Sequence, residues 1–488
     1  MGCDLSLLYL FELERLEELE RLEQEELRRS RRRRNRYRNF RITINRYKST
    51  MNINELPIEL LEKILIYTDG VFLARYRTVC KRWYNVITQS NYLWIHRCML
   101  ESKANSLKAK ENSSPDISWY QIYRNLNMWP HISKQKKKLL NFFRLPSHET
   151  ETTTADLNQG ILVVNSRDYT KLVDVNRPGT KPIIINGKQK CEKIVSTDNV
   201  TALLIDTNLL YIQRTVNFND MKSEALFEDV KVFSLHEEEL FYCTRNNIIY
   251  RVDLLKKDLE KELCFNFRDT TTVYKTKDNV QHLFVKYVKT GCVDIVLYTE
   301  DACIYTYRNN ILYSTALVMN FLYRLNYSVV DEHTMIGYLG NLMKITTPGE
   351  NLVLTFPAIQ VAVLYNNHLV FATQNNKIYV LNLVKIFGKY MFEIDENLFD
   401  QIGSVPKKCV VKKICITEGC TGPIIMVSTT ERIYLYKTNF FPMDKGPRIF
   451  ENTKLYERLT ALRDRLEEKH RADVLAIVRR PTKRKLST

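Results

Sequence analysis

The chain has 488 residues, of which 44% are hydrophobic and 26% are charged; this predicts two or more globular units and excludes a wholly disordered chain. The formal net charge of +17 is concentrated in an arginine-rich segment at 28–38 and a basic tail at 483–485, so it does not indicate a nucleic-acid-binding body. The 11 cysteines lack C-x-x-C spacing, which argues against a secreted disulfide framework, and no apolar run reaches the ~18 residues of a membrane span.

Residues 1–50 are compositionally distinct from the rest of the chain. Residues 12–27 read ELERLEELERLEQEEL, and leucines that recur every three residues drift around a helix of about 3.6 residues per turn. The absence of a sustained apolar seam favours a solvated single helix over a coiled coil. We predict that the arginine-rich segment is disordered. Residues 1–50 are therefore interpreted as a low-complexity extension, helical or disordered, that folding of the remainder does not require.

The N-terminus fits a lipidation pattern. Gly2 follows the initial methionine and Ser6 completes the N-myristoylation pattern, while Cys3 is available for palmitoylation. The arginine-rich segment would add electrostatic attraction to acidic lipids, which makes a membrane one candidate partner. Met51, directly before the first globular signal, offers an alternative start that would remove all of these residues.

The basic segments also have competing interpretations. The arginine run, with Tyr37 and Phe40 interleaved, is typical of a nuclear localisation signal or of a nucleic-acid-binding arm, and residues 481–485 read as a second nuclear signal. Before that tail, leucines at 455, 459, 462 and 466 predict a helix that docks on its own domain. We assign 451–488 to a C-terminal helix and basic tail, and expect a cytoplasmic and/or nuclear location.

Residues 52–98 carry apolar side chains at helical spacing. Asn54 is placed to cap a first helix with Pro57 in its first turn, and Asp69-Gly70 is placed to end that helix. We predict a second helix over 74–86 and a short third apolar stretch at 92–95. Three short helices in under about fifty residues bury too little apolar surface for independent stability, so a partner or an adjoining domain is expected to cover them.

Two further segments separate this region from the strands. Residues 101–114 (ESKANSLKAKENSS) are predicted to be a polar linker. Residues 115–130 place Trp119, Tyr123 and Leu126 on one helical face, which predicts a short amphipathic helix. We treat 99–140 as a helical linker.

From about residue 155 onward, a strand, a short polar turn and a second strand recur seven times. These hairpins span residues 161–175, 202–214, 240–253, 295–308, 334–347, 369–382 and 424–437. Turn residues such as Asn246-Asn247, Gly340-Asn341 and Asn375-Asn376 tolerate the left-handed backbone that tight hairpins need. The two longest intervals fit surface insertions over Lys257–Lys277 and Val384–Lys408.

The repeat predicts a β-propeller over residues 141–450. Its period agrees with the roughly 40–50 residues of a four-stranded blade, and closure of seven such units into a ring would remove exposed sheet edges. A sandwich of unrelated hairpins is the alternative. No Gly-His…Trp-Asp signature is present, and all four tryptophans precede residue 130, so a standard WD repeat is not indicated and a divergent one is left open. The predicted fold class is α+β multidomain: a small three-helix domain followed by an all-β propeller of about seven blades.

Residues 51–98 resemble the F-box motif. Its opening, Leu-Pro-x-Glu-Leu-Leu-x-x-Ile-Leu, corresponds to residues 56–65; its middle, Val-Cys-Lys-x-Trp, to 79–83; and its end, Leu-Trp, to 93–94. Order and spacing match over about a tenth of the chain. The stretch 69–77 departs from the family because Leu73 is its only leucine where two leucine-rich turns are usual, which leaves the packing of the middle helix open.

The resemblance implies a non-catalytic adaptor of an SCF-type ubiquitin ligase. In this family, the F-box binds a Skp-type adaptor, which links it to a cullin scaffold, and the second domain binds the protein to be ubiquitinated. By this resemblance, eight residues are divided between the adaptor interface and the motif's own core: Leu56, Pro57, Leu60, Leu61, Ile64, Leu65, Val79 and Trp83. Residues 118–129 would hold the F-box rigidly against the propeller. Sequence does not identify the substrate or its binding residues.

The sequence offers little support for an enzyme. It lacks the G-x-S-x-G, Walker A, Rossmann and H-E-x-x-H patterns, and its eight histidines are scattered. Cys409, Cys415 and Cys420 have no histidine nearby, so we predict neither a metal nor a cofactor. The alternative functions are a non-catalytic propeller scaffold and a basic-arm nucleic-acid-binding protein, each with a vestigial F-box.

Overall fold

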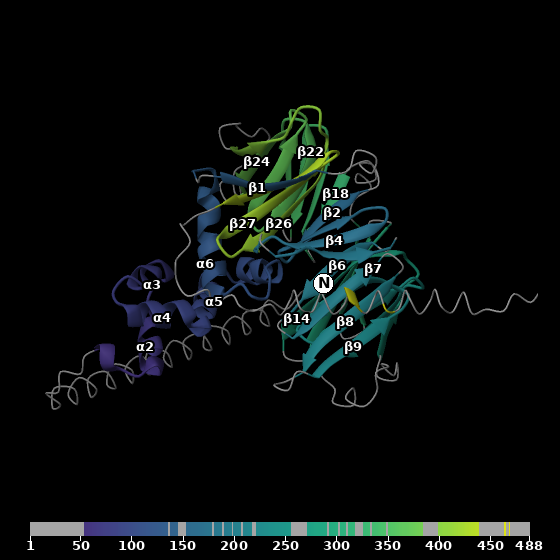
Figure 1. The fold of residues 1–488 in the computed structure, drawn as a ribbon. Coiled ribbons are helices and arrows are strands. Elements are labelled where there is room, and N and C mark those ends of the chain that lie inside the picture. The colour runs from purple at the N-terminus through teal and green to yellow at the C-terminus, as the bar shows by residue number, and fades with distance from the viewer. Residues whose placement is uncertain are drawn as a thin grey trace, which may run out of the picture. The chain divides into compact units, whose positions relative to one another are not determined.

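The computed structural model (Figure 1) divides the chain into two units, one that ends at Gln89 and one that begins at Ser90. The structure describes residues 53–438 apart from the segments 135–136, 145–152, 178–179, 188–189, 198, 206–207, 217–220, 255–270, 290–291, 301–302, 309–310, 318–325, 332–333, 348–349 and 384–398, and after them only residues 463, 464 and 468. The predictions for Gly2, Cys3, the arginine-rich segment and the C-terminal leucine seam therefore fall outside the described residues, apart from those last three positions.

The first unit contains short helices. They are the 3-10 turn η1 (Ile53–Glu55) and the α-helices α2 (Ile58–Leu65), α3 (Gly70–Tyr76) and α4 (Lys81–Gln89). Helix α4 contacts both α2 and α3.

Three local predictions for this unit are wrong. Asn54 lies inside η1, and Pro57 is the N-cap residue of α2 because its fixed backbone leads directly into the helix. Asp69 starts a helix instead of ending one, since its carboxylate accepts the Val71 N–H at 2.8 Å. The predicted second helix is two helices, and the break spans 77–80.

The second unit opens with α5 (Asn91–Glu111), α6 (Trp119–Met128) and the 3-10 helix η2 (Trp129–Lys134). Ser90 caps α5, and Ser118 forms a capping box with Gln121 at the start of α6. Helix α5 is interrupted at Ser102 but continues to Glu111, so the expected polar linker at 101–114 is mostly helical. The predicted amphipathic helix at 115–130 is confirmed as α6.

Seven four-stranded antiparallel sheets follow, which we call blades 1 to 7 in chain order. Blades 1 to 3 contain β2 (Thr154–Asn158), β3 (Ile161–Asn165), β4 (Tyr169–Asp174), β5 (Ile183–Asn186); β6 (Cys191–Ser196), β7 (Val200–Ile205), β8 (Leu209–Val216), β9 (Met221–Phe227); β10 (Val230–His236), β11 (Glu239–Thr244), β12 (Ile248–Asp253) and β13 (Thr271–Lys275). Blades 4 and 5 contain β14 (Val280–Lys289), β15 (Cys292–Thr299), β16 (Cys303–Arg308), β17 (Ile311–Leu317); β18 (Asn326–Val329), β19 (Met335–Leu339), β20 (Leu342–Thr347) and β21 (Glu350–Thr355). Blades 6 and 7 contain β22 (Ile359–Tyr365), β23 (His368–Thr373), β24 (Lys377–Asn382), β25 (Asp400–Ser404); β26 (Val411–Gly419), β27 (Gly422–Thr429), β28 (Arg432–Thr438) and β1 (Lys137–Arg144).

The seven predicted hairpins are the middle two strands of the seven sheets, which confirms the propeller. The predicted turns also have the expected backbone, since φ is positive at Asn247 (57°), Gly340 (56°) and Asn376 (59°). Each of the two predicted insertions includes an outer strand, β13 in the first and β25 in the second. The residues before these strands, 255–270 and 384–398, are outside the described part of the chain.

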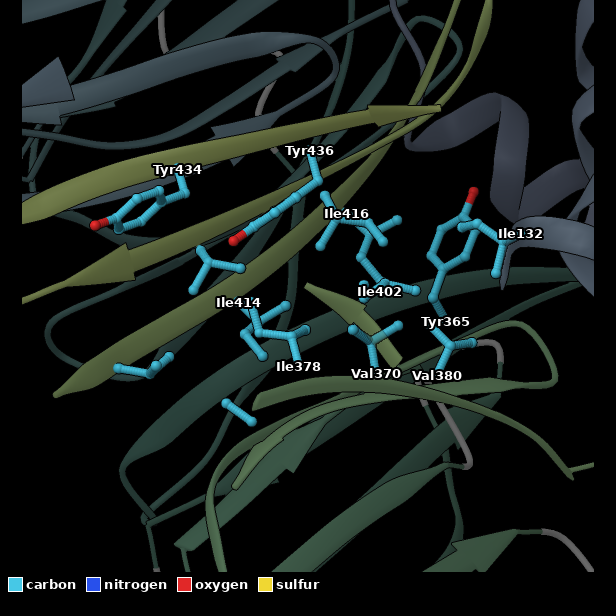
Figure 2. Close-up of a cluster of buried hydrophobic side chains, with 14 of the residues drawn as sticks. Ile132, Tyr365, Val370, Ile378, Val380, Ile402, Ile414, Ile416, Tyr434 and Tyr436 are labelled. Carbon is cyan, nitrogen blue, oxygen red and sulfur yellow. The ribbon is translucent and has the colours of Figure 1, made fainter. Parts of the chain in front are cut away.

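The ring closes through a strand from the N-terminal side of the propeller. Strand β1 pairs antiparallel with β28, with Lys137 opposite Thr438 and Arg144 opposite Arg432, and so supplies the outer strand of blade 7. Neighbouring blades share apolar clusters all the way round, including one that joins blade 7 to blade 1. The cluster between blades 6 and 7 is drawn in Figure 2, with Ile378 and Val380 facing Ile414 and Ile416.

A threonine recurs at the end of the second strand in several blades. In four of them, its hydroxyl donates to the carbonyl of a residue that begins the third strand: Thr244 to Ile248, Thr299 to Cys303, Thr373 to Lys377 and Thr429 to Arg432. The side chain thus ties the two ends of the hairpin turn together.

Candidate protein-docking surface

Helix α2 has two apolar faces, one buried and one exposed. Leu61 and Leu65 lie one turn apart and are 0% and 1% exposed. Leu60 and Ile64, also one turn apart, are 45% and 47% exposed. A helix in a small domain needs one apolar face for its own core. The second face of α2 is therefore available to another molecule.

The exposed apolar surface continues through α3 and the adjoining turns. Leu73 is buried, whereas most other large apolar residues of this segment are not. Nine large apolar side chains of the first unit are at least 36% exposed: Ile53, Ile58, Leu60, Ile64, Tyr67, Val71, Phe72, Tyr76 and Val79. Single exposed apolar residues are ordinary, but so many within 27 residues of sequence mark an interaction surface.

Polar and aromatic contacts hold the helices in position. Arg82 donates to the Leu56 carbonyl, which ties α4 to the start of α2. The rings of Tyr76 and Trp83 meet edge to face at 5.8 Å. Arg77 donates to the Thr88 hydroxyl at 2.9 Å. These contacts fix the helix arrangement without using the exposed side chains of α2.

The structure separates most of the eight residues singled out in the sequence. Leu61 and Leu65 belong to the core, and Pro57, Leu60, Ile64 and Val79 are exposed. Leu56 and Trp83 are half-buried. Their roles in adaptor binding stay predictions.

The second unit contains a buried polar cluster that sequence reasoning missed. Glu418, on β26, is 0% exposed. Its carboxylate accepts from Trp129 Nε1 at 3.0 Å, Tyr365 OH at 2.8 Å and Asn125 Nδ2 at 2.9 Å. Because a buried carboxylate without partners is strongly unfavourable, the three donors and the glutamate depend on one another. This cluster fixes α6 and η2 to blades 6 and 7.

Burial dominates the electrostatics of this cluster. Desolvation raises the pKa of Glu418, and the hydrogen bonds from Trp129, Tyr365 and Asn125 oppose that rise. Burial and the nearby Glu418 carboxylate raise the pKa of the Tyr365 hydroxyl well above its usual range, so it remains a donor.

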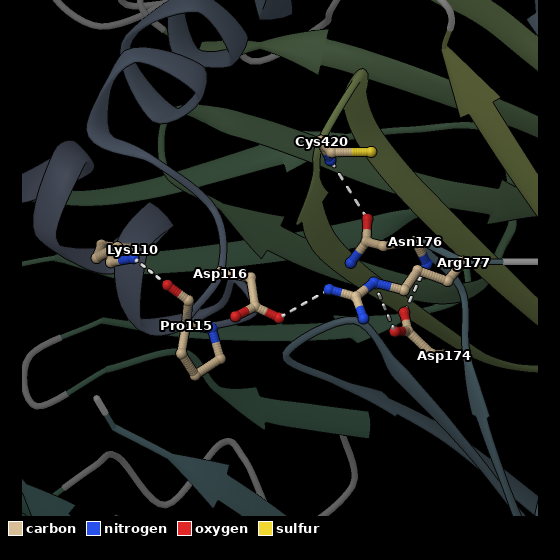
Figure 3. A network of polar contacts seen from close by, with 7 residues as sticks. All are labelled: Lys110, Pro115, Asp116, Asp174, Asn176, Arg177 and Cys420. Atoms are coloured by element: carbon tan, nitrogen blue, oxygen red, sulfur yellow. Dashed lines mark hydrogen bonds and ion pairs between the residues drawn. The ribbon is translucent and has the colours of Figure 1, made fainter. Parts of the chain in front are cut away.

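Further contacts place the helical segment on one face of the propeller. Arg124 donates to the Cys420 carbonyl at 2.6 Å, and the Arg177 guanidinium lies 3.5 Å from Asp116 (Figure 3). Lys108 pairs with Asp331 at 3.0 Å, and Gln159 donates to the Glu111 carbonyl at 2.8 Å.

These contacts share a common position in the blades. Gln159, Asp331 and Cys420 each lie in the turn between the first and second strands of a blade. Such turns all lie on the same face of a propeller, because successive strands run in opposite directions. The face formed by the second-to-third-strand turns is the opposite one.

Among the described residues, no group of His, Cys, Asp or Glu side chains is arranged to hold a metal ion, and no helix is long and apolar enough to cross a membrane. The three cysteines near the C-terminal blade do not converge. Cys415 instead donates to Asp156 at 3.1 Å, and burial raises the pKa of its thiol.

Comparisons with known proteins identify the helices of residues 53–100. A family model described as F-box-like matches residues 53–100. The F-box protein At3g08750 of Arabidopsis thaliana is 42% identical over 41 residues, which is 8% of this chain and 11% of that protein. The chain thus covers about a tenth of the length of this curated relative.

Solved propellers match the second unit only loosely. The WD40 domain of Neurospora crassa Pan2 is 11% identical at a TM-score of 0.42, over 63% of this chain and 97% of that chain. The WD40 propeller domain of Doa1 is 12% identical at a TM-score of 0.38, over 62% and 97%. The fold assignment therefore rests on the strand pairing described above.

The protein combines an F-box-like domain at residues 53–100 with a seven-bladed β-propeller. An F-box together with a propeller is typical of non-catalytic adaptor proteins.

Proposed function

We propose that the protein is the substrate-recognition subunit of an SCF-type ubiquitin ligase. The observation that carries the proposal is the exposed second face of α2, Leu60 and Ile64, inside a segment that matches the F-box. A Skp-type adaptor would bury this face, and a cullin scaffold would join through the adaptor. The propeller would bind the protein substrate.

The Glu418 cluster supports the positioning role that this function needs. Ubiquitin transfer depends on holding a substrate lysine near a loaded thioester, so a loose connection between domains would lower the rate. Residues 108–129 lie against the propeller through two buried hydrogen bonds to Glu418 and the ion pair of Lys108 with Asp331, which gives the propeller a rigid N-terminal support.

The substrate would bind on a propeller surface that the helical segment leaves open. The contacts of 108–129 described above lie on the face of the first-to-second-strand turns. The opposite face, formed by the second-to-third-strand hairpins, is therefore the candidate for substrate docking, and loops on such faces adapt readily to partners.

Copurification with a Skp-type adaptor tests the proposal. We expect the Leu60→Ala plus Ile64→Ala variant to lose most adaptor and cullin, because it removes exposed side chains that the core does not use. Leu107→Ala is the matched control, since Leu107 is an exposed leucine of α5 at 40%. Unchanged recovery of adaptor with the double variant would refute the proposal.

The membrane and nuclear interpretations of the N-terminal segment remain separate proposals. Gly2 and Cys3 are the candidate lipidation sites, and metabolic labelling with a myristate analogue of wild type and Gly2→Ala tests them. Deletion of residues 1–50 tests the alternative of a nucleic-acid-binding arm, whose binding would be lost on deletion and would fall steeply with salt.

A further inference from the structure

The outer strand of blade 4, β17, differs from the outer strands of the other blades. The outer strands β1, β9, β13, β21 and β25 each contain at least one charged residue. Strand β5 has none, but it is four residues long, follows Lys181-Pro182 and buries alternate residues. Charges, prolines, β-bulges and short length are features by which proteins protect sheet edges from foreign strands. Strand β17 reads ILYSTAL over seven residues, so it has neither a charge nor a proline, and it shares with β1, β13 and β25 a bulge, which falls at Tyr313.

The side chains at the start of β17 are exposed on both faces of the sheet. Residues 311–315 are all exposed, with Ile311 at 72%, Leu312 at 49% and Tyr313 at 64%. Ile311 pairs with Arg308 and Leu312 with Tyr307, so these two side chains point to opposite faces. Ser314 pairs with Thr306, which leaves Tyr313 as the extra residue of a β-bulge. Within the described part of the chain, β17 pairs with β16 and its other edge has no strand beside it.

The arginine opposite Ile311 is paired within its own blade. Arg308 makes a bidentate ion pair with Asp294 at 2.7 and 2.8 Å, and its guanidinium lies 4.3 Å from the Tyr313 ring centre. The Arg308 charge is therefore paired within blade 4, and the same guanidinium contacts the Tyr313 ring at the edge.

We propose that β17 is a docking edge at which an extended segment of a partner protein adds to blade 4 as a fifth strand. Main-chain hydrogen bonds would supply affinity, and apolar side chains beside Ile311 on one face and Leu312 on the other would supply specificity. The expected segment is uncharged over the residues opposite 311–313.

The size of the edge favours an extended segment over a second folded copy of this chain. Seven residues make a strip about 23 Å long and about 10 Å deep, far below the roughly 800 Å² per partner of a standard interface between folded proteins. An extended segment does not need such an area, because its backbone would hydrogen-bond to the regular parts of the strand on either side of Tyr313. The inference goes beyond the proposed ligase function and does not depend on adaptor binding.

The test selects peptides from a displayed library of random octapeptides on the full chain. The selected peptide is then synthesised, and its affinity for wild type and for the Leu312→Lys plus Tyr313→Lys variant is measured by fluorescence anisotropy. This variant gives β17 charged side chains, as most other outer strands have. We expect alternating apolar residues and a loss of roughly tenfold or more with the variant, because a lysine would have to lie beside an apolar strand.

Two controls separate strand addition from nonspecific hydrophobic binding. Leu339→Lys changes an equally exposed leucine at a hairpin tip of blade 5, 52% exposed, and should leave binding unchanged. A copy of the peptide N-methylated at alternate residues keeps its side chains but loses backbone donors, and should bind at least as weakly as the peptide binds the lysine variant. Circular dichroism confirms that the variants fold.

Several outcomes would overturn the inference. These are peptides that bind wild type and the lysine variant equally, an N-methylated peptide that binds as well as its parent, or a selection that yields no β17-dependent peptide. Dimerisation that the lysine variant abolishes would assign the edge to a second copy. Protection, in the free chain, of the amides of 311–317 that point away from β16 would assign the edge to the chain itself. Adaptor copurification should be normal in the lysine variant, so failure here and failure of the ligase function are distinguishable.

Discussion

Leu61 in α2 and Leu162 in blade 1 are both fully buried, but the residues before them differ. Leu60 is 45% exposed, whereas Ile161 is 2% exposed. The strand is buried on both faces because each blade lies between two others, so consecutive residues find apolar neighbours. The helix has one internal face only. The strands between neighbouring blades therefore cover their own apolar surface, and helix α2 does not.

The largest effect is expected where the propeller secures the helical segment. Trp129→Ala should lower the free energy of unfolding by about 3–5 kcal/mol, because a fully buried indole is removed. It also leaves Glu418 short of one donor. Urea denaturation of the full chain measures the loss. Trp129→Phe, which keeps a ring but no N–H, should lose less, and equal losses would show that the hydrogen bond contributes nothing.

A second prediction uses adjacent leucines within α2. Leu61→Ala should destabilise the F-box-like helices by about 2–5 kcal/mol, as a buried leucine does. Leu60→Ala should change their stability by less than about 0.5 kcal/mol, because the side chain is already half in water. Native-state hydrogen exchange at α2 amides compares the two. Similar losses would mean that Leu60 is part of the core.

A third and smaller effect concerns pH. Because burial raises the pKa of Glu418, the folded state binds this proton more tightly than the unfolded state. Stability from this group is then complete below the ordinary glutamate pKa of about 4.3 and declines as pH rises through the folded pKa. Glu418→Gln should therefore gain stability relative to wild type as pH rises from 4 to 7 in urea titrations. A constant difference would show that the three donors keep the carboxylate at its ordinary pKa.

The sequence predicts the propeller where contacts are local. The seven hairpins join strands a few residues apart, and their Asn and Gly turns carry a local signal. Strand β1 has no such signal, because its partner β28 lies almost the whole propeller away along the chain. The sequence does not predict the outer strands of the blades either, because several of them follow segments whose length varies from blade to blade.

The helices show the same limit at their ends. The motif predicts the F-box-like segment. The break between α3 and α4 at 77–80 contains neither Pro nor Gly, so the sequence carries no local signal for it. Glu418 sits in a Thr-Glu-Gly sequence that looks like an exposed turn. Its burial depends on Asn125, Trp129 and Tyr365, which are distant in sequence.

The most direct test of the proposed adaptor surface is a hydrogen-exchange footprint of the full chain with and without a purified Skp-type adaptor. We predict that amides of α2 and α3 exchange more slowly once the adaptor is bound, because binding stabilises helices that the chain covers on one side only, while the blade strands stay unchanged. Protection of α2 and α3 that is already complete in the free chain, or an unchanged footprint at saturating adaptor, would contradict the account.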